Sequence, residues 1–523
     1  MNQRMLCALA AVTVSAPGCL TGQQARERGA SAITEEDFAQ RVGVIAHDSM
    51  GGRATPSRGL ELTAAWIAAE LSDMGLRGGA PDGSFVQRYP LRAVAVDAAG
   101  SSLRTGSGTG GQTASLSYGP DILPLAPSRA SGEVTGQLVL VSGSTDPERA
   151  LRGAAVRGKH AVLVAPGSEA GVDRTGFSLA IAIRRAGAAS VLVTNASDDD
   201  RWRATVPAAL EPEVETAWGG ASVPAEPFRP LLQVRTSSLE SLLAGTGVDL
   251  AALQRRATGE VRVDAVDGWT LTLTQRLDTR SISAPNVVGI VDGSDPVLRD
   301  EYVVFSAHMD HLGIGGPDES GDSIFNGADD DASGTVAVME VAQAVASLAM
   351  APRRSMIFLL VSGEERGLWG SEYYADNPSV PVDRIVAGLN ADMVGRNWPD
   401  TIVAIGKEHS DLGATLERVN GAHPEIGMTA IDDLWPEERF YFRSDHHNFA
   451  RKGVPILFFF NGTHDDYHGL DDEPERIDAE KAARIARLLF HLGVDIANAD
   501  ARPRWHPESY ERIVTDRGGA GSR

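Results

Sequence analysis

The feature that most constrains the fold of this chain is an alternation of apolar and amphipathic segments over residues 266–498. Short runs rich in Val, Ile, Leu and Phe predict strands at 286–291, 302–306, 355–361, 385–389, 402–405 and 455–460. Segments with helical spacing fall between them, at 333–350, 367–375, 411–420 and 479–496. Apolar strands that alternate with helices are typical of parallel sheets covered on both faces. We therefore predict an α/β fold with a mixed, mostly parallel central sheet flanked by helices.

The block at 133–265 has a different character. Its apolar strand candidates at 138–141, 161–165 and 190–193 accompany one helical segment at 177–186. The block contains few histidines and no cluster of metal-ligating residue types. We expect a small, β-rich α/β domain inserted into the larger one, where it serves as a binding or lid domain.

The N-terminal residues predict that the protein is exported. Residues 1–19 contain Arg4, an apolar stretch at 5–16 and small residues before Cys19, a pattern typical of a secretory signal. The segment before Cys19 resembles a bacterial lipobox, although Ala16 and Pro17 stand where Leu and a small residue are usual. We expect either a lipoprotein of the cell envelope or periplasm, anchored to the membrane through Cys19, or a secreted protein. A polar tether should follow up to residue 33, and the basic, Gly-rich residues 501–523 should be disordered.

Charge and composition exclude two classes of protein. The 523 residues include 48 Lys+Arg and 70 Asp+Glu, so the formal net charge is −22. A nucleic-acid partner would need a positive surface, and the aromatic content of 6% gives little material for base stacking. No apolar run reaches the ~18–20 residues of a membrane-spanning helix, so we expect no transmembrane helix in the mature chain.

Five segments rich in acidic residues and histidine follow the predicted strands of 266–498. They read S-A-H-M-D-H-L-G (306–313), N-G-A-D-D-D-A-S-G-T (326–335), V-S-G-E-E-R-G-L-W-G-S (361–371), L-N-A-D-M-V-G (389–395) and D-D-Y-H-G-L-D-D (465–472). Because ligands of open α/β sheets bind at the carboxyl ends of strands, these segments should converge on one crevice. Histidine and carboxylate donors without cysteine suit Zn, Mn or Co in a hydrolytic site.

Each of these residues alone also has an ordinary structural explanation. Asp331 and Ser333 could cap the helix that follows them, and Glu364 with Glu365 could form a solvated pair. The apolar run that leads straight into Ser362-Gly363-Glu364-Glu365 is difficult to explain as surface. The occurrence of all five segments at strand ends of one block favours a metal site.

These motifs, in this order, resemble those of co-catalytic zinc exopeptidases of the aminopeptidase Y, bacterial leucine aminopeptidase and glutamate carboxypeptidase II type. The resemblance covers about 35–95 and 266–498. Between them, G-K-H-A-V-L-V-A (158–165) and A-G-A-A-S-V-L-V (186–193) resemble the protease-associated (PA) domain. The resemblance implies two zinc ions per chain, for which Mn²⁺ or Co²⁺ could substitute. The implied ligands are His308, Asp330, Glu365, Asp392 and His468, with Asp330 bridging the two metals.

The resemblance also implies roles around the metals. Glu364 is similar to the general base, Asp310 to the carboxylate that orients His308, and Tyr467 to the hydroxyl that steadies the oxyanion. Arg443 lies where some members contact the substrate, and a cis peptide is implied between Asp330 and Asp331. The remaining histidines near the motifs are interpreted as structural or rim residues; they are His311, His446, His447 and His464.

From this resemblance we predict a zinc-dependent exopeptidase that acts on peptides, most simply an aminopeptidase in which a metal-activated water attacks the peptide bond. A glutamate-type carboxypeptidase would use the same metal ligands, a receptor-like binding protein would share the scaffold without catalysis, and a glutaminyl-cyclase-like transferase would use one zinc. The predicted division of the chain has five parts: signal peptide and tether at 1–33, the N-terminal part of the peptidase domain at 34–132, the PA-like domain at 133–265, the catalytic domain at 266–500 and the tail at 501–523.

Overall fold

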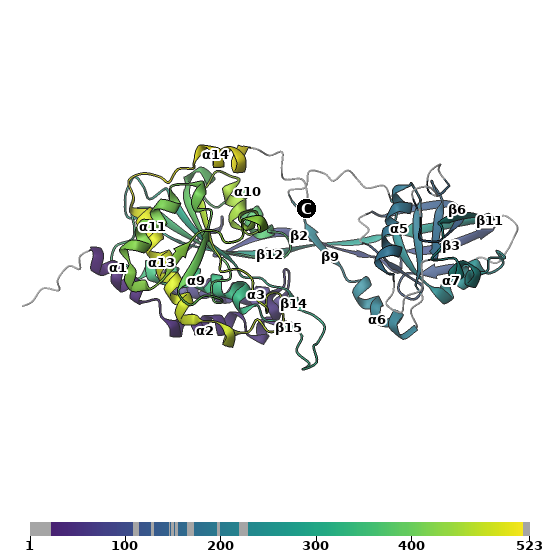
Figure 1. Ribbon diagram of the computed structural model, residues 1–523, viewed down its shortest axis with the longest axis horizontal. Helices are drawn as coiled ribbons and strands as arrows, with labels where there is room; N and C mark the ends of the chain where they lie inside the picture. Colours follow the sequence, from purple (N-terminus) through teal and green to yellow (C-terminus); the bar gives the residue numbers. More distant parts are fainter. Residues whose placement is uncertain are drawn as a thin grey trace, which may run out of the picture. The chain divides into compact units, whose positions relative to one another are not determined.

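The computed structural model of the chain forms two compact units. It describes residues 22–107, 114–126, 130–145, 147, 151, 155–164, 172–195, 199–218 and 228–515. Unit 1 comprises Met1–Tyr89 and Ser283–Arg523, and unit 2 comprises Pro90–Ile282 (Figure 1). The predicted signal segment and Cys19 lie outside the described residues.

A mixed, mostly parallel sheet forms the centre of unit 1, which confirms the predicted fold class. Its strand order is β19-β18-β20-β17-β13-β16-β12, with β2 and the short β1 also beside β12. Strand β13 pairs in parallel with β16 and β17, and the pairs β17–β20 and β18–β19 are also parallel. The pairs β12–β16 and β18–β20 are antiparallel. The strand bounds are Arg77–Gly78 (β1), Val86–Val96 (β2), Leu277–Val291 (β12), Tyr302–His308 (β13), Ser355–Val361 (β16), Ile385–Ala391 (β17), Thr401–Ile405 (β18), Thr429–Ile431 (β19) and Ile456–Phe459 (β20).

Helices cover both faces of this sheet (Figure 1). On one face α9 (Gly334–Ala346) and α13 (Ala479–Asn498) pack on the central strands and on each other, with α2 (Glu35–Ile45), α3 (Arg58–Asp73) and α11 (Leu412–Ala422) beside them. On the other face α12 (His446–Ala450) packs against β17 and β20, and α10 (Trp369–Asp376) packs on α12. Close approach of α13 to β13 depends on Gly493, since a Cβ there would lie 2.2 Å from the ring of Phe305.

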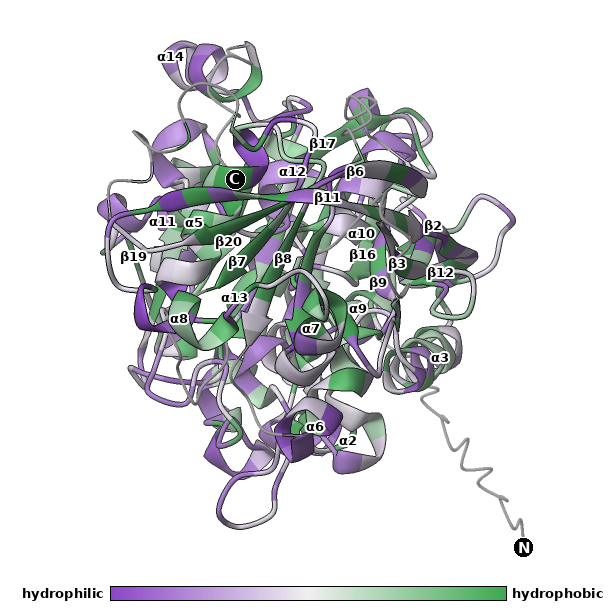
Figure 2. Cartoon of the chain, turned by 90° about the vertical axis from the view of Figure 1, so that its right-hand side faces the viewer, coloured by the Kyte–Doolittle hydropathy of each residue, from purple (hydrophilic) through white to green (hydrophobic). Residues whose placement is uncertain are grey.

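Unit 2 is built on an eight-stranded sheet with the order β4-β3-β11-β6-β7-β8-β10-β5. Its middle strands β6, β7, β8 and β10 are parallel, and antiparallel strands flank them. The bounds are Ser102–Ser107 (β3), Ser115–Ser117 (β4), Ile122–Pro124 (β5), Gly132–Ser142 (β6), His160–Val164 (β7), Ser190–Asn195 (β8), Leu231–Arg235 (β10) and Arg262–Gln275 (β11), with Glu213–Thr216 (β9) pairing with β2. The helices are Arg174–Arg185 (α5), Asp199–Ala209 (α6), Thr236–Leu243 (α7) and Leu250–Arg255 (α8). Figure 2 shows the apolar character of β7 and β8, whose described side chains are all buried, and the polar surface of α6.

Three segments differ from the sequence-based division. Unit 2 begins before and ends after the insert predicted at 133–265, because β3, β5 and β11 pair within its sheet. The expected polar tether contains the helix α1 (Gly22–Ser31), whose end is held because Ala30 and Ile33 are buried. The expected disordered tail contains α14 (Pro507–Tyr510) and the helical turn Glu511–Thr515, where Ile513 joins the core of unit 1.

The assignment of unit 2 as a PA domain stays a prediction. Among the described residues, none of the helices combines the length and apolar character needed to cross a membrane.

Candidate metal centre

The predicted donors lie at the carboxyl ends of the strands of unit 1. His308 is the last residue of β13, Glu364 and Glu365 follow β16, and Asp392 follows β17 directly. Asp330 lies in the helical turn Ala328–Ser333, which leads into α9. Because β13 runs parallel to both β16 and β17, these ends share one edge of the sheet.

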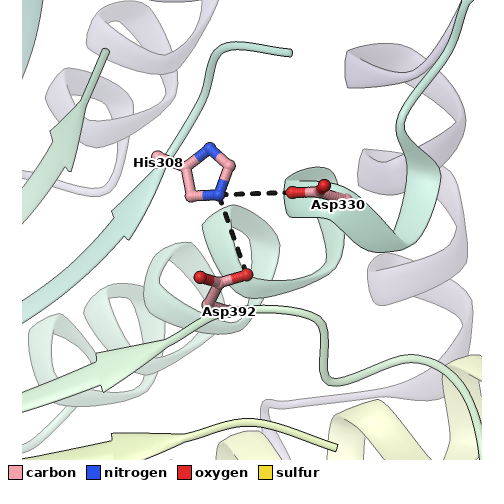
Figure 3. A group of neighbouring side chains, drawn as sticks. All are labelled: His308, Asp330 and Asp392. Carbon is pink, nitrogen blue, oxygen red and sulfur yellow. Dashed lines mark ion pairs between the residues drawn. The ribbon is translucent and has the colours of Figure 1, made fainter. Parts of the chain in front are cut away.

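A first group of donors consists of His308, Asp330 and Asp392 (Figure 3). Nε2 of His308 is 3.3 Å from Oδ1 of Asp330 and 3.7 Å from Oδ1 of Asp392. All three residues are buried, and one donor atom of each lies within 4.8 Å of the others. Nitrogen and carboxylate donors at such spacing fit a zinc ion.

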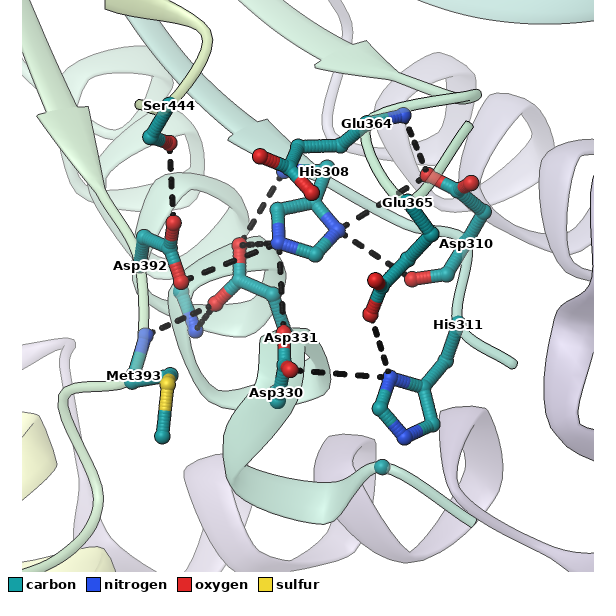
Figure 4. Close-up of polar contacts among 12 residues, drawn as sticks. His308, Asp310, His311, Asp330, Asp331, Glu364, Glu365, Asp392, Met393 and Ser444 are labelled. Atoms are coloured by element: carbon teal, nitrogen blue, oxygen red, sulfur yellow. Dashed lines mark hydrogen bonds and ion pairs between the residues drawn. The ribbon is translucent and has the colours of Figure 1, made fainter. Parts of the chain in front are cut away.

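A second group surrounds the other oxygen of Asp330. Nε2 of His468 is 3.1 Å from Oδ2 of Asp330 and 3.3 Å from Oε1 of Glu365. His311 also belongs here, because its Nδ1 is 2.9 Å from Oε1 of Glu365 and 3.7 Å from Oδ2 of Asp330 (Figure 4). The two oxygens of Asp330 thus face two different groups, which is the arrangement that a bridging carboxylate requires.

His311 is the one member of these groups that was interpreted from the sequence as a structural or rim residue. A signal for it was present, because His311 shares the short segment H-M-D-H with His308 and Asp310 at a strand end. The other three histidines so interpreted, His446, His447 and His464, are members of neither group.

The two neighbours of Asp330 hold the backbone around it. Oδ2 of Asp331 accepts the backbone N–H of His308, and its Oδ1 accepts those of Gly334 and Met393. Asp329 accepts the N–H of Gly395 through Oδ1. By accepting the N–H of Gly334, Asp331 caps the start of α9, which is the structural role considered for it in the sequence. The Asp330–Asp331 peptide is cis, as the resemblance implied.

Asp310 connects three parts of the site. Its Oδ2 accepts a hydrogen bond from the hydroxyl of Thr55, and its Oδ1 accepts the backbone N–H of Glu364 at 3.3 Å. Nδ1 of His308 lies 3.2 Å from the carbonyl oxygen of Asp310 and 3.7 Å from Oδ1. The backbone carbonyl is therefore the nearer partner of His308, whereas the resemblance implied the carboxylate.

Arg53 is a buried cation beneath these loops. Its guanidinium donates to the carbonyl oxygens of Ile45, Met309, Asn326 and Gly327 at 2.6–3.0 Å. These bonds tie the segment before Asp310 to the turn before Asp330. This role could not be predicted, since an isolated arginine forms no recognisable sequence pattern.

The carboxylates of the site have strongly perturbed acidity. Burial raises the pKa of Glu364 well above its usual value, and the neighbouring Asp445, Asp392 and Glu365 raise it further against the opposing effect of His308. Burial also raises the pKa of Asp392. Burial acts in the same direction on Asp330, but hydrogen bonds from His308 and His468 outweigh it and hold its pKa well below the usual value. Such a gathering of buried carboxylates favours binding of cations.

A cavity of about 330 Å³ opens onto the two groups. Glu364 and Tyr467 lie in its polar wall, and the ring of Tyr467 stacks on His468 with centroids 3.9 Å apart. The apolar wall consists of Met393, Trp435, Phe440, Phe458 and Phe460. Arg443 lies at the cavity too, where its Nη1 pairs with Oε2 of Glu438 at 3.2 Å and its guanidinium lies over Phe440.

Two donor groups around one shared carboxylate, at the strand ends of an α/β sheet, are typical of two-metal hydrolases. Residues 286–493 match the model of peptidase family M28. The match confirms the family predicted from the five motifs.

Two curated relatives are similar over part of the chain. Leupeptin-inactivating enzyme 1 of Streptomyces exfoliatus is 28% identical over 252 residues, which cover 46% of this chain and 52% of the relative. A probable zinc metalloprotease of Pyricularia oryzae is 28% identical over 294 residues, which cover 47% and 56%. The chain thus spans about half the length of these relatives. Among solved structures, the zinc aminopeptidase BSAP of Bacillus subtilis is 16% identical with a TM-score of 0.49, covering 93% of this chain and 96% of that one.

Proposed function

We propose that this protein is a zinc-dependent aminopeptidase that removes N-terminal residues from peptides. The observation that carries the proposal is the carboxylate of Asp330, whose two oxygens face His308 and His468 in a cavity that the half-buried Glu364 also lines. Two zinc ions per chain fit the donors: His308 and Asp392 on one side, Glu365 and His468 on the other, and Asp330 between them. The name of the relative from Pyricularia oryzae, a probable zinc metalloprotease, supports a zinc-dependent peptidase.

The chain's own residues supply the proton transfers. Zinc, when bound, acts as a Lewis acid and brings the pKa of a bound water toward neutrality. Glu364 lines the cavity and accepts the proton of the attacking water, then passes it to the leaving amine. Burial raises the pKa of Glu364 and favours the protonated form that the second transfer needs, whereas the positive charge of bound zinc would lower this pKa and favour the carboxylate that accepts the first proton.

Tyr467 is the donor for the oxyanion that develops on the substrate carbonyl. Burial, followed by the nearby carboxylates, raises the pKa of its hydroxyl above the usual value, so the hydroxyl keeps its proton near neutral pH. One well-placed donor of this kind contributes ~3–4 kcal/mol to catalysis.

The surroundings of the cavity favour an aminopeptidase over a glutamate-type carboxypeptidase. The polar wall includes four carboxylates, which suit the α-ammonium group of a peptide: Asp330, Glu364, Asp392 and Glu438. Recognition of two substrate carboxylates would need a cluster of cations, whereas Arg443 is the one Arg or Lys among the described lining residues, and it pairs with Glu438. The aromatic wall suits a large apolar N-terminal side chain.

The test is hydrolysis of a matched set of leucyl peptides by the full-length protein. We expect cleavage of the free peptide and of its C-terminal amide, and loss of cleavage on N-acetylation or on addition of a chelator. Release of residues from the C-terminus would favour the carboxypeptidase. Cleavage of the acetylated peptide at the same rate as the free one would overturn the aminopeptidase assignment.

We also propose that the protein acts outside the cytoplasm and that Cys19 is lipidated. The support is the signal-like segment at 1–19 and the small residues before Cys19. Metabolic labelling with a radioactive fatty acid should mark the wild-type protein and leave Cys19→Ser unlabelled. An unlabelled wild-type protein in the culture medium would support the secreted form instead.

A further inference from the structure

His311 lies where a metal ligand could lie. It follows β13, its side chain is fully buried, and its Nδ1 is 2.9 Å from Oε1 of Glu365. Figure 4 shows the ring with its Nδ1 edge toward Glu365 and Asp330. Spacing alone therefore allows two roles, a direct bond to the second metal or a hydrogen bond that holds Glu365.

The backbone of Gly327 lies close to the ring of His311. Gly327 has φ +57°, and a Cβ at this position would lie 2.5 Å from both Cδ2 and Cγ of His311. The backbone N–H of His311 lies 3.4 Å from the carbonyl oxygen of Arg53. With backbone and ring both confined, the Nδ1 edge has Glu365 as its nearest partner.

The second ring nitrogen indicates which tautomer is present. Nε2 of His311 is buried and has no hydrogen-bond partner among the residues that the structure describes. A buried N–H without a partner costs ~1–3 kcal/mol, and orphaned donors are rarer in proteins than under-satisfied acceptors. The neutral ring is therefore more stable with its proton on Nδ1, where the N–H can donate to Glu365. A protonated Nδ1 has no lone pair for a metal.

We propose that His311 is a positioning residue, which holds the carboxylate of Glu365 toward Asp330 and His468 by donating its Nδ1–H to Oε1. The inference rests on the two-metal centre of the proposed function. Partners that orient a metal-ligating carboxylate typically change metal affinity 10–100-fold. His311 thus sets the affinity of the second site, while the first site, with His308 and Asp392, does not depend on it.

Three substitutions separate hydrogen bonding, ligation and packing. His311→Asn places an amide N–H near the position of Nδ1, His311→Gln extends its amide toward the position of Nε2, and His311→Leu fills the space without a donor. Each full-length variant is stripped of metal and titrated with zinc against a chelating dye, and bound zinc is counted per chain. Thermal unfolding checks that each variant is folded.

We expect the second equivalent of zinc to bind 10–100-fold more weakly in His311→Leu and His311→Gln, and within about threefold of wild type in His311→Asn. The first equivalent should bind within threefold of wild type in all three. If His311→Leu does not fold, comparing His311→Asn with His311→Gln still distinguishes a hydrogen-bond donor from a metal ligand.

Two results would overturn the proposal. Wild-type affinity in His311→Leu, or in His311→Gln, would make His311 a packing residue, and equal weakening in His311→Asn and His311→Gln would make it a ligand. The readout is metal binding, so it is independent of peptide cleavage. A protein that binds two zinc ions with this pattern but cleaves no peptide would contradict the proposed function and leave the role of His311 intact.

Discussion

Glu364 lines the cavity beside His308 and Asp392, yet it belongs to neither group of metal donors. Glu364→Gln keeps the shape of the side chain and removes its capacity to accept a proton. We expect turnover to fall about 10²–10⁴-fold with two zinc ions per chain retained. Steady-state kinetics and metal analysis of the same preparation measure both quantities.

The adjacent residue provides the control for this substitution. Glu365→Gln should weaken the second zinc, because Glu365 lies 3.3 Å from His468 in the second group. Turnover of Glu364→Gln within threefold of wild type would remove Glu364 from the role of general base.

At the residue scale, the sequence predicted which side chains gather but not how they are held. The resemblance selected Asp330 from three consecutive aspartates, and its two oxygens indeed face different histidines. The contacts of Asp331, Asp329 and Arg53 with distant backbone groups could not be predicted, since they depend on loops that meet only in the folded chain. His311 was missed because the five ligands implied by the resemblance already accounted for both metals.

At the scale of elements, α9 contains a buried acid away from the site. Glu340 pairs with Arg41, and burial raises its pKa from the usual value to about 7. The folded state therefore binds more protons than the unfolded state between about pH 4.5 and 7, so the stability contributed by this group falls as pH rises through that window. Between pH 4.5 and 8, we expect the free energy of unfolding to fall by up to about 3 kcal/mol more in the wild-type protein than in Glu340→Gln.

Denaturant unfolding of both proteins at several pH values measures this difference. Neutral glutamine keeps a hydrogen-bonding oxygen for Arg41. A difference in how the free energy of unfolding depends on pH therefore reports the titration of Glu340 rather than the loss of its contact with Arg41. Parallel stability profiles would show that Glu340 does not titrate in this window.

Helix α13 begins with a cap that can be removed cleanly. Asp478 accepts the backbone N–H of Lys481 through its side chain. Asp478→Ala should lower the free energy of unfolding by about 1 kcal/mol, because one N–H of the first turn loses its partner. Asp495→Ala on the same helix removes only an exposed pair with Arg418 and should cost less than half as much. Equal losses in the two variants would contradict the capping role.

The strands were the best predicted elements, because a run such as Ser355–Val361, buried at every residue, leaves a strong apolar signal. Helix α1 and the segment 507–515 were missed for the opposite reason. Their sequences are polar, and they are ordered through a few apolar contacts, such as those of Ile33 and Ile513, with surfaces that the sequence does not specify.

At the scale of the whole molecule, metal binding should be coupled to stability. Unit 1 buries several carboxylates close together, and burial raises the pKa of Glu364 and Asp392, so their charged forms are unfavourable without a cation. Zinc at 100 times its dissociation constant would add about 2.7 kcal/mol per site. We expect a chelator to lower the melting temperature by several degrees and zinc to restore it, as measured by calorimetry.

The variant Asp330→Ala serves as the control for this experiment, because both sites share that carboxylate. Its melting temperature should respond little to chelator or zinc. Equal melting temperatures of the wild-type protein with chelator and with zinc would contradict the coupling.

The contacts of Thr55 have a consequence for the timing of synthesis. Its hydroxyl donates to Asp310 and accepts the N–H of Gly363, which lies 308 residues further along the chain. At ~5–20 residues per second a ribosome needs roughly 15–60 s to add that stretch, and His468 follows later still. The nascent chain thus spends most of its synthesis without a complete centre, and the proposed hydrolytic activity would arise only after nearly all of the polypeptide has been made.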